Sequence, residues 1–427
     1  MAFIANSYIL VENNVWLWYL IIPAFIVINV FAGIFGIKTQ RIRLKICNHG
    51  VIMLSAFRFS LAVSIVWQSL LGLKYLPENW QSFLYGLIFC AVAEYIIFWN
   101  GIICVYLTSY QLGIKHRLIG ILCGLIPIVN LIVLSVIIHI VRTEVFFESE
   151  KALKNNERKD LRVCETKYPI LFVHGVFFRD SKYLNYWGRI PDELEQNGAT
   201  VYYGEHHSAA SVEFCGEELT SRIKFIVNKT GCEKVNIIAH SKGGLDCRYA
   251  INKCGASPYI ASLTTVNTPH RGCVFAEYLL NNVSEDLKMK VASVYNSTLK
   301  KCGDTFPDFL ESVGDLTASA CAKFNEEEDR TDGIYCQSIG SVLKKAKGGK
   351  FPLNFSYHLV NYFDGPNDGL VSTSSFEWGE KYTLVTAPSK YGISHCDIID
   401  LNRENINGFD VREFYVDLVS DLKKRGL

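Results

Sequence analysis

The chain lacks an excess of either charge and lacks the cysteine and histidine spacing of metal sites. Its 427 residues carry 43 Lys and Arg against 42 Asp and Glu, so the formal net charge is +1. Without a basic excess, nucleic acid is not an expected partner. The 14 cysteines show neither metal-ligand spacing nor a paired disulfide framework. Disorder is excluded because 49% of the residues are hydrophobic and 13% aromatic, enough for packed cores.

Charge is scarcest in the first third of the chain, where four long apolar runs occur. The runs are Val15–Ile37, Val51–Leu73, Phe83–Leu107 and Leu118–Val141. Each reaches the ~20 residues that a helix needs to cross the hydrocarbon of a bilayer. Four buried helices of a soluble bundle would show polar stripes at helical spacing, and these runs do not. The sequence therefore predicts a transmembrane region of four helices over residues 1–142.

The distribution of Lys and Arg predicts how these helices are oriented. No basic residue precedes Lys38, so the first run lacks the n-region of a cleaved signal peptide and should be retained. Basic residues crowd the first and third loops, whereas the second loop has only Lys74. By the positive-inside rule both termini, and with them the C-terminal domain, should then be extracytoplasmic. Arg142, Lys151 and Lys154, just after the fourth run, favour the opposite orientation.

Two charges lie inside the apolar runs, Arg58 in the second and Glu94 in the third. Charged side chains are costly in lipid and are normally paired or line a pathway. In antiparallel helices both would fall near mid-depth, so we expect a buried ion pair that holds the two helices together. A polar transport or sensing site is the alternative.

The pattern changes after the membrane region. Residues 143–167 carry mixed charges and predict a solvated linker or juxtamembrane helix. From residue 168 to 427, short β-rich runs alternate with amphipathic stretches, which predicts one α/β domain with a mostly parallel sheet covered on both faces. The strand candidates are Tyr168–Val173, Thr200–Tyr203, Lys234–Ala239, Leu263–Val266 and Leu359–Phe363. Two helices are expected because apolar residues recur at helical spacing. One contains Cys215, Leu219, Ile223 and Ile226, and the other contains Phe414, Leu418 and Leu422.

The sharpest motif is the sequence KVNIIAHSKGG at Lys234–Gly244. An apolar strand candidate runs into Ala-His-Ser-Lys-Gly, and a helical stretch follows from about Leu245. This strand–turn–helix context is typical of the nucleophile elbow G-x-S-x-G, with Ala239 in place of the first glycine. Small residues are needed on both sides because the sharp turn strains the backbone and exposes the serine hydroxyl. The motif predicts Ser241 as a nucleophile.

A nucleophilic serine needs a base, which in this kind of fold follows the serine and an acid along the chain. Only His270, His358 and His395 follow Ser241. His270 comes too soon for an acid on a later strand to lie between, and His358 lies beside the strand candidate Leu359–Phe363 and before Asp364 and Asp368. His395, in a loop before the C-terminal helix, is the predicted base.

The acid and the oxyanion donors are predicted from position. Asp364 and Asp368 both lie in a turn-rich loop and both qualify by spacing, although either could be a turn aspartate that binds its own backbone. The backbone N–H after the nucleophile, that of Lys242, should stabilise the oxyanion together with an N–H after an early strand. Val176, following the strand candidate that starts at Tyr168, fits the second position.

Six sequence blocks occur in order from Tyr168 to the C-terminus: YPILFVHG, YWGRIPDELEQNGATVYY, KVNIIAHSKGG, TPHRG, NDGLV and SHCD. In this order they resemble the bacterial true lipases, the α/β-hydrolases typified by the Pseudomonas and Burkholderia triacylglycerol lipases. The resemblance does not extend to the membrane region. It implies Ser241 as nucleophile, Asp368 as acid and His395 as base, with the Val176 and Lys242 amides as oxyanion donors.

The resemblance also implies a mobile helical lid, over about residues 274–320, and a structural Ca²⁺ ion. The lid would carry apolar residues at helical spacing, namely Val283, Leu287, Val291 and Val294. Asp397 matches one of the family's calcium-binding aspartates, but residues 345–351 offer no carboxylate for the second. Cys336 lacks the family's disulfide partner, since serines and a threonine occupy residues 372–375. No other cofactor is expected.

Together these features predict a membrane-anchored serine ester hydrolase that cleaves acyl esters of lipids through an acyl-enzyme. Its partners would be an acyl-ester substrate and a lipid bilayer. Two alternatives remain: an acyltransferase or thioesterase that uses the same three residues, and a non-catalytic, hydrolase-like binding module on a membrane anchor.

Overall fold

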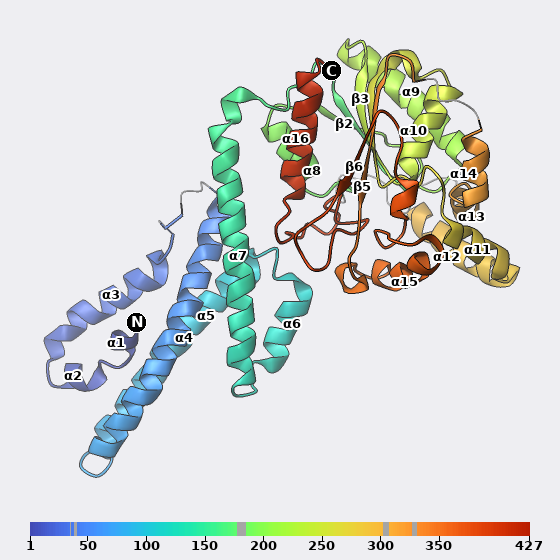
Figure 1. Ribbon diagram of the computed structural model, residues 1–427. Helices are drawn as coiled ribbons and strands as arrows, with labels where there is room; N and C mark the ends of the chain where they lie inside the picture. Colours follow the sequence, from blue (N-terminus) through green and yellow to red (C-terminus); the bar gives the residue numbers. More distant parts are fainter. Residues whose placement is uncertain (35, 38–40, 177–184, 302–306, 327–330) are drawn as a thin grey trace. The chain divides into compact units, whose positions relative to one another are not determined.

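The computed structural model divides the chain into two compact units, Met1–Glu157 and Arg158–Leu427 (Figure 1). It describes residues 1–427 except 35, 38–40, 177–184, 302–306 and 327–330.

All the regular secondary structure described in the first unit is helical. Three of its helices, α4, α5 and α7, are long and apolar enough to cross a membrane, and the apolar segment Val15–Phe31 is shorter. The elements in order are α1 (Ala2–Ala5), α2 (Tyr8–Glu12), the 3-10 helix η1 (Val15–Leu17), α3 (Trp18–Phe31), α4 (Ile42–Tyr75), α5 (Trp80–Thr108), α6 (Gly113–Cys123) and α7 (Val129–Glu157).

The run Leu118–Val141, predicted as one membrane span, is divided between two helices. Helix α6 ends at Cys123 and α7 begins at Val129. Between them lies Pro127, whose ring disfavours helical backbone at the preceding residue, and Ile128 has a positive φ of 68°. The chain therefore turns within the apolar run. The segment predicted as a linker or juxtamembrane helix continues α7 as far as Glu157.

The predicted ion pair between Arg58 and Glu94 is wrong. The buried Glu94 Oε1 accepts hydrogen bonds from Ser60 Oγ (2.6 Å) and Ser64 Oγ (3.0 Å), while Arg58 Nη1 donates to Ser135 Oγ (3.0 Å). Residues two apart on a helix face different directions, whereas residues four apart share a face. The face of α4 that carries the two serines therefore meets Glu94, and Arg58 points elsewhere.

The second unit contains a six-stranded sheet in which every pair of neighbouring strands is parallel, in the order β2-β1-β3-β4-β5-β6 (Figure 1). The predicted parallel α/β architecture is confirmed. The strands are β1 (Ile170–Val173), β2 (Val201–Tyr203), β3 (Val235–His240), β4 (Ile260–Val266), β5 (Tyr335–Ser341) and β6 (Lys381–Val385). The helices are η2 (Lys159–Leu161), α8 (Ile190–Gln196), α9 (Val212–Thr230), α10 (Lys242–Asn252), η3 (Ser257–Tyr259), α11 (Val274–Asn282), α12 (Glu285–Lys301), α13 (Phe309–Gly314), α14 (Ala318–Phe324), η4 (Ala346–Gly348), α15 (Leu353–Asp364), η5 (Thr373–Ser375) and α16 (Val411–Lys424).

Successive side chains of each strand point to opposite faces of the sheet and form two apolar cores. On one face Phe172 and Ile238 pack with residues of α8 and α16, such as Leu194 and Val419. On the other face the strands pack against α9 and α10. The predicted helix residues Cys215, Leu219, Ile223 and Ile226 are all buried on α9. Both faces of the sheet are thus covered, as expected for parallel strands.

Four of the five predicted strands are confirmed, and the fifth is wrong. Leu359–Phe363 belongs to helix α15, whose apolar residues recur at helical rather than alternating spacing. Strands β5 and β6 were not predicted. Their sequences, YCQSIGS and KYTLV, contain polar and small residues that hide the strand pattern, and β5 is nevertheless almost entirely buried.

Candidate active site

Ser241 lies at the sharp turn between β3 and α10, at the carboxyl edge of the sheet. Its backbone has φ 54° and ψ −131°, a strained conformation for a residue with a side chain. The turn is held by a hydrogen bond from Ser241 N to the carbonyl of Val266 (2.9 Å) and by one from Gly244 N to the carbonyl of Ser241 (3.1 Å). These are the features expected of a nucleophile elbow.

The small residues around Ser241 are required by close packing. A Cβ at Gly243 would lie 2.4 Å from the carbonyl oxygen of His174, and one at Gly175 would lie 2.8 Å from Cβ of Ser241. The end of β1 therefore touches the elbow. Val176, the predicted second oxyanion donor, is the next residue along this segment and is buried. Lys242, the predicted first donor, is the first residue of α10, where backbone N–H groups have no helical partner.

Asp368 lies in the loop after α15, fully buried. Its Oδ1 accepts hydrogen bonds from the backbone N–H groups of Leu370 (2.9 Å) and Val371 (2.8 Å). Its Oδ2 accepts one from Asn267 Nδ2 (2.7 Å) and faces His395 Nδ1 at 2.6 Å. The carboxylate is therefore fixed in orientation, with one oxygen directed at the imidazole.

His395 lies in the loop after β6, next to the elbow. Its Nδ1 donates to Asp368 Oδ2, and its backbone N–H donates to the carbonyl of Asp368 (2.9 Å). The His395 ring lies 4.5 Å, centroid to centroid, from the ring of His240, the neighbour of Ser241. Among the described residues Ser241 and His395 form no hydrogen bond, which is common in serine hydrolases before substrate binds. The structure thus places His395 between Asp368, the acid that the family resemblance implied, and the elbow that carries Ser241.

The sequence did not predict three residues that support this arrangement: Asn267, Tyr186 and His240. Asn267, at the carboxyl end of β4, donates to Asp368 as well as to Ser341 Oγ. Tyr186 Oη lies 2.6 Å from Nδ1 of the buried His240. Burial and the neighbouring His395 hold the pKa of His240 well below its usual value, so that this ring is neutral. In the sequence, the role of Asn267 could have been inferred only from its place as a polar residue directly after an apolar strand.

The two rejected histidines lie in other surroundings. His270 is buried, stacks on Trp378, and has Nε2 at 2.9 Å from Thr265 Oγ1. Burial and the nearby guanidinium of Arg248 hold the pKa of His270 well below its usual value. His358 lies on helix α15, so the strand predicted at this point is wrong. The side chain is exposed, which agrees with its exclusion as the base.

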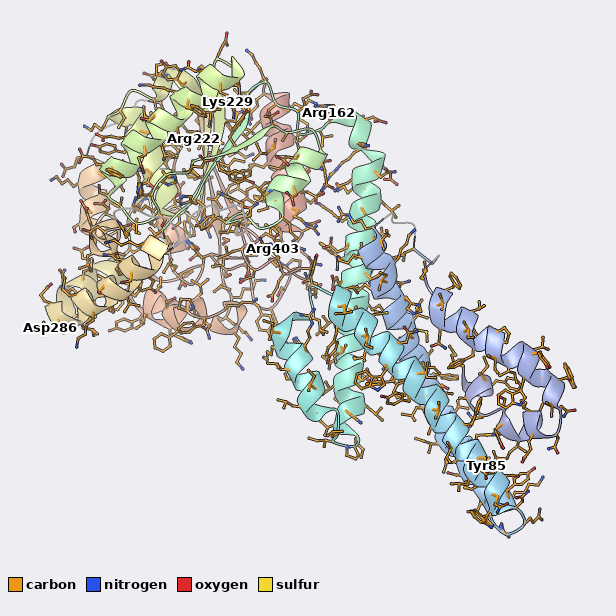
Figure 2. All side chains as sticks on the ribbon, turned by 180° about the vertical axis from the view of Figure 1, so that it is seen from behind. Tyr85, Arg162, Arg222, Lys229, Asp286 and Arg403 are labelled. Atoms are coloured by element: carbon orange, nitrogen blue, oxygen red, sulfur yellow. The ribbon has the colours of Figure 1, made fainter. Side chains whose placement is uncertain are left out.

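An apolar cavity of about 390 Å³ opens beside Ser241. Its walls come from α11, α12 and α13, the region predicted as a lid. Three of the four predicted apolar lid residues line it, while Val294 is exposed. Figure 2 shows Asp286 at the start of α12, at the outer end of this helical region. The wall includes Ala276, Leu280, Val283, Leu287, Val291 and Leu310.

Known esterases and lipases are similar to the C-terminal part of this chain. Residues 191–317 match the family described as "Putative serine esterase (DUF676)". A triacylglycerol lipase of Vibrio cholerae is 28% identical over 289 residues, covering 62% of this chain and 90% of the relative. One from Burkholderia plantarii is 31% identical over 172 residues, covering 38% of this chain and 48% of the relative. These likenesses support a serine esterase or lipase-type hydrolase.

Among solved structures, the mature Bacillus licheniformis lipase BlEst2 is 21% identical. The alignment covers 60% of this chain and 92% of the other chain, with a TM-score of 0.46.

The side chain of Lys242 is buried beneath the elbow of this hydrolase. Its Nζ lies 2.6 Å from Asp246 Oδ1, one turn along α10. Burial raises the pKa of Asp246 to about 6, against the opposing effect of Lys242. Burial lowers the pKa of Lys242, but Asp246 together with Cys215 and Asp315 outweighs this effect, and the net shift is upward. His206 approaches the other oxygen of Asp246 (3.7 Å) and stacks on His174. The network thus connects α10 with the segment that carries Val176.

Asp246→Asn should destabilise the protein by roughly 3–5 kcal/mol, because the Lys242 ammonium would remain buried without its counter-charge. The free energy of unfolding of the full chain in detergent, measured by chemical denaturation, tests this. Asp192→Asn, at an exposed position on α8, is the control and should change stability little. Replacing both partners, Lys242→Met with Asp246→Leu, should restore much of the loss. An Asp246→Asn protein as stable as the wild type would contradict this account.

The calcium site that the family resemblance implies at Asp397 stays a prediction. Asp397 Oδ2 accepts a hydrogen bond from the backbone N–H of Ser394 (3.1 Å). The nearby carboxylate of Glu404 forms an ion pair with Lys350 (2.6 Å). Among the described residues no group of three or more His, Cys, Asp or Glu side chains could hold a metal ion. Calcium usually takes six to eight oxygen ligands.

Proposed function

We propose that the C-terminal unit is a serine ester hydrolase in which Ser241, His395 and Asp368 form a catalytic triad. His395 accepts the proton of Ser241 as the hydroxyl oxygen attacks the carbonyl carbon of an acyl ester. Asp368 holds the imidazole in the tautomer whose Nε2 is free to accept that proton. The backbone N–H groups of Lys242 and Val176 stabilise the tetrahedral oxyanion.

Collapse of the tetrahedral intermediate releases the alcohol, which takes its proton from His395, and leaves an acyl-enzyme on Ser241. Water, deprotonated by the same imidazole, then attacks the acyl carbonyl and frees the carboxylic acid. The single observation that carries the proposal is the 2.6 Å contact between His395 Nδ1 and Asp368 Oδ2 beside a serine in elbow conformation.

The most direct experiment is hydrolysis of p-nitrophenyl esters of several chain lengths by the full chain in detergent. Ester hydrolysis together with covalent labelling of Ser241 by a fluorophosphonate probe is the expected result. If neither is seen with correctly folded protein, the unit is a binding module and the proposal fails.

We further propose that the substrates are acyl esters of lipids and that the first unit anchors the enzyme in a membrane. The cavity beside Ser241 is lined almost entirely by apolar side chains, which suits a hydrocarbon chain. Three helices of the first unit have the length and composition of membrane spans. An anchored hydrolase would meet lipid esters at high local concentration.

Ala276→Trp should shift the preference of the enzyme from long to short acyl chains. Ala276 lines the cavity from α11, and an indole in its place would occupy the space that a long chain needs. We expect kcat/KM for a long-chain ester to fall by roughly 10- to 200-fold relative to a short-chain ester, the range that one to three kcal/mol of pocket contacts supports.

The matched control is Ala322→Trp, at an exposed position of α14 that does not line the cavity. It should leave the ratio of the two kcat/KM values unchanged. An equal loss for both esters in the Ala276→Trp protein would mean that the cavity does not hold the acyl chain.

A further inference from the structure

The directions of the helices in the first unit follow from their contacts. Helices α4 and α5 run antiparallel, since a Cβ at Gly50 would lie 2.8 Å from Val105 and one at Gly72 would lie 3.2 Å from Phe83. Figure 2 shows Tyr85 close to the far tip of this helical hairpin. The opposite end, where α4 begins and α5 ends, carries Arg41, Arg43 and Lys45 and is named the basic end.

Helix α7 also runs antiparallel to α4, and therefore parallel to α5. Arg43, near the start of α4, forms a 2.8 Å ion pair with Glu144, far along α7. Arg58, deeper along α4, binds Ser135, earlier on α7. Because α5 and α7 run in the same direction, the chain runs toward the basic end along both helices.

Glu144 fixes this arrangement by binding the connection that follows α5. Its carboxylate accepts hydrogen bonds from Ser109 Oγ (2.5 Å) and from the backbone N–H groups of Tyr110 (3.0 Å) and Gln111 (3.1 Å). Glu144 is 1% exposed, so this is a buried, specific contact. The chain leaves the basic end at residue 112 and has returned to it by residue 144.

Between these points α6 and the first half of α7 form an apolar hairpin. Helix α6 has 11 residues, or about 17 Å of length, against ~30 Å for the hydrocarbon of a bilayer. The turn exposes Leu125 (94%) and Ile128 (73%), which is unfavourable in water. An apolar cavity of about 670 Å³ lies between this hairpin and the neighbouring helices. The hairpin therefore suits a lipid environment.

The backbone of the turn is largely satisfied from within, as lipid requires. The N–H of Ile126 donates to the carbonyl of Cys123 (3.1 Å), and that of Asn130 donates to the carbonyl of Ile126 (3.0 Å). The side chain of Asn130 donates to the carbonyl of Gly124 (3.3 Å).

Basic residues are concentrated at the end where α7 leaves the apolar region. Near the far tip of the α4–α5 hairpin, Lys74 is the only Lys or Arg among the described residues. Lys and Arg mark cytoplasmic segments close to membrane spans. The basic end carries Arg41, Arg43, Lys45, Lys115, Arg117 and Arg142.

We propose that α6 and the first half of α7 enter and leave the membrane on the same side, so that the hydrolase unit is cytoplasmic. This inference goes beyond the proposed function and, with it, specifies the substrate source: acyl esters reached from the cytoplasmic leaflet. The extracytoplasmic prediction depended on Leu118–Val141 crossing the membrane once. When that run folds back, Arg142, Lys151 and Lys154 no longer conflict with the loop charges, because all lie on one side.

The state of the cysteines agrees with a cytoplasmic position. All 13 described cysteines are free thiols, nine of them in the hydrolase unit. Thiols persist in the reducing cytosol, whereas extracellular domains usually pair them.

Reporter fusions to the full chain in a bacterial host test the proposal. Green fluorescent protein at the C-terminus should fluoresce, and alkaline phosphatase there should be inactive, because its disulfides do not form in the cytosol. Phosphatase inserted between Glu78 and Asn79, at the tip of the α4–α5 hairpin, should be active.

An active C-terminal phosphatase with a dark fluorescent fusion would overturn the proposal. So would reporters that place the Glu78–Asn79 insertion and the C-terminus on the same side. The Ser241→Ala chain should give the same reporter pattern as the wild type, since the reporters do not depend on ester hydrolysis. Failure of the topology and failure of the proposed catalysis are therefore distinguishable.

Discussion

Ser241→Ala should lower kcat for ester hydrolysis by a factor on the order of 10⁵ to 10⁶, the loss seen when a serine hydrolase is deprived of its nucleophile. The methyl group cannot form the acyl-enzyme, and the buried imidazole of His395 is left without a proton to accept. Steady-state hydrolysis of a p-nitrophenyl ester measures the loss. Labelling by a fluorophosphonate probe should disappear at the same time.

The matched control is Ser221→Ala, at an exposed position of α9, where the hydroxyl donates to the carbonyl of Glu217 in its own helix. This variant should keep its activity and its labelling. If Ser241→Ala retained more than about one hundredth of the wild-type kcat, after correction for contaminating esterases, Ser241 would not be the nucleophile.

Asp368→Asn should lower kcat by a factor on the order of 10⁴ while leaving the fold intact. The amide is nearly the same size, but its NH₂ group can face His395 Nδ1 and favour the wrong tautomer of the imidazole. The ring would then present a proton, rather than a lone pair, to Ser241. Kinetics of the purified full chain, with circular dichroism as a check on folding, measure the effect.

Asp364→Asn is the matched comparison, because sequence spacing alone left both aspartates open. The carboxylate of Asp364 accepts hydrogen bonds from the backbone N–H groups of Val274 and Phe275 (3.1 Å each) at the start of α11. Its loss should cost at most about 0.5–2 kcal/mol of stability, as for other helix caps, and leave most of kcat. A larger loss of kcat in Asp364→Asn than in Asp368→Asn would reverse the assignment of the acid.

Local sequence was sufficient to predict the elbow and four of the six strands of the sheet. The run Val235–His240 is apolar, small residues flank Ser241, and an amphipathic helix follows, so each local preference supports the same structure. The same agreement holds for β1, β2 and β4. The order of residues along the chain then left three histidines, and only His395 lies in a loop near the C-terminus.

Where local pattern is weak, sequence could not predict the fold. Strand β5 is buried in the sheet although its sequence YCQSIGS looks polar, because Gln337 and Ser338 find partners in neighbouring elements. The aromatic residues that made Leu359–Phe363 resemble a strand lie instead on α15, where Tyr362 is exposed. The choice between helix and strand at such positions is made by tertiary contacts.

The sequence by itself determined that this protein has an apolar helical region, a parallel α/β unit and a serine in a sharp strand–helix turn, because each depends on neighbours in the chain. Residue spacing left Asp364 and Asp368 open and the family resemblance favoured Asp368, but only the tertiary structure showed that Asp368 faces His395, that Asn267 supports the acid, and that the last apolar run folds back at Pro127. The first two outcomes depend on hydrogen bonds between residues far apart in sequence, and the third depends on how α6 packs beside α7. Hydropathy and residue spacing show which residues are apolar, but they do not show which buried polar groups will form hydrogen bonds with each other.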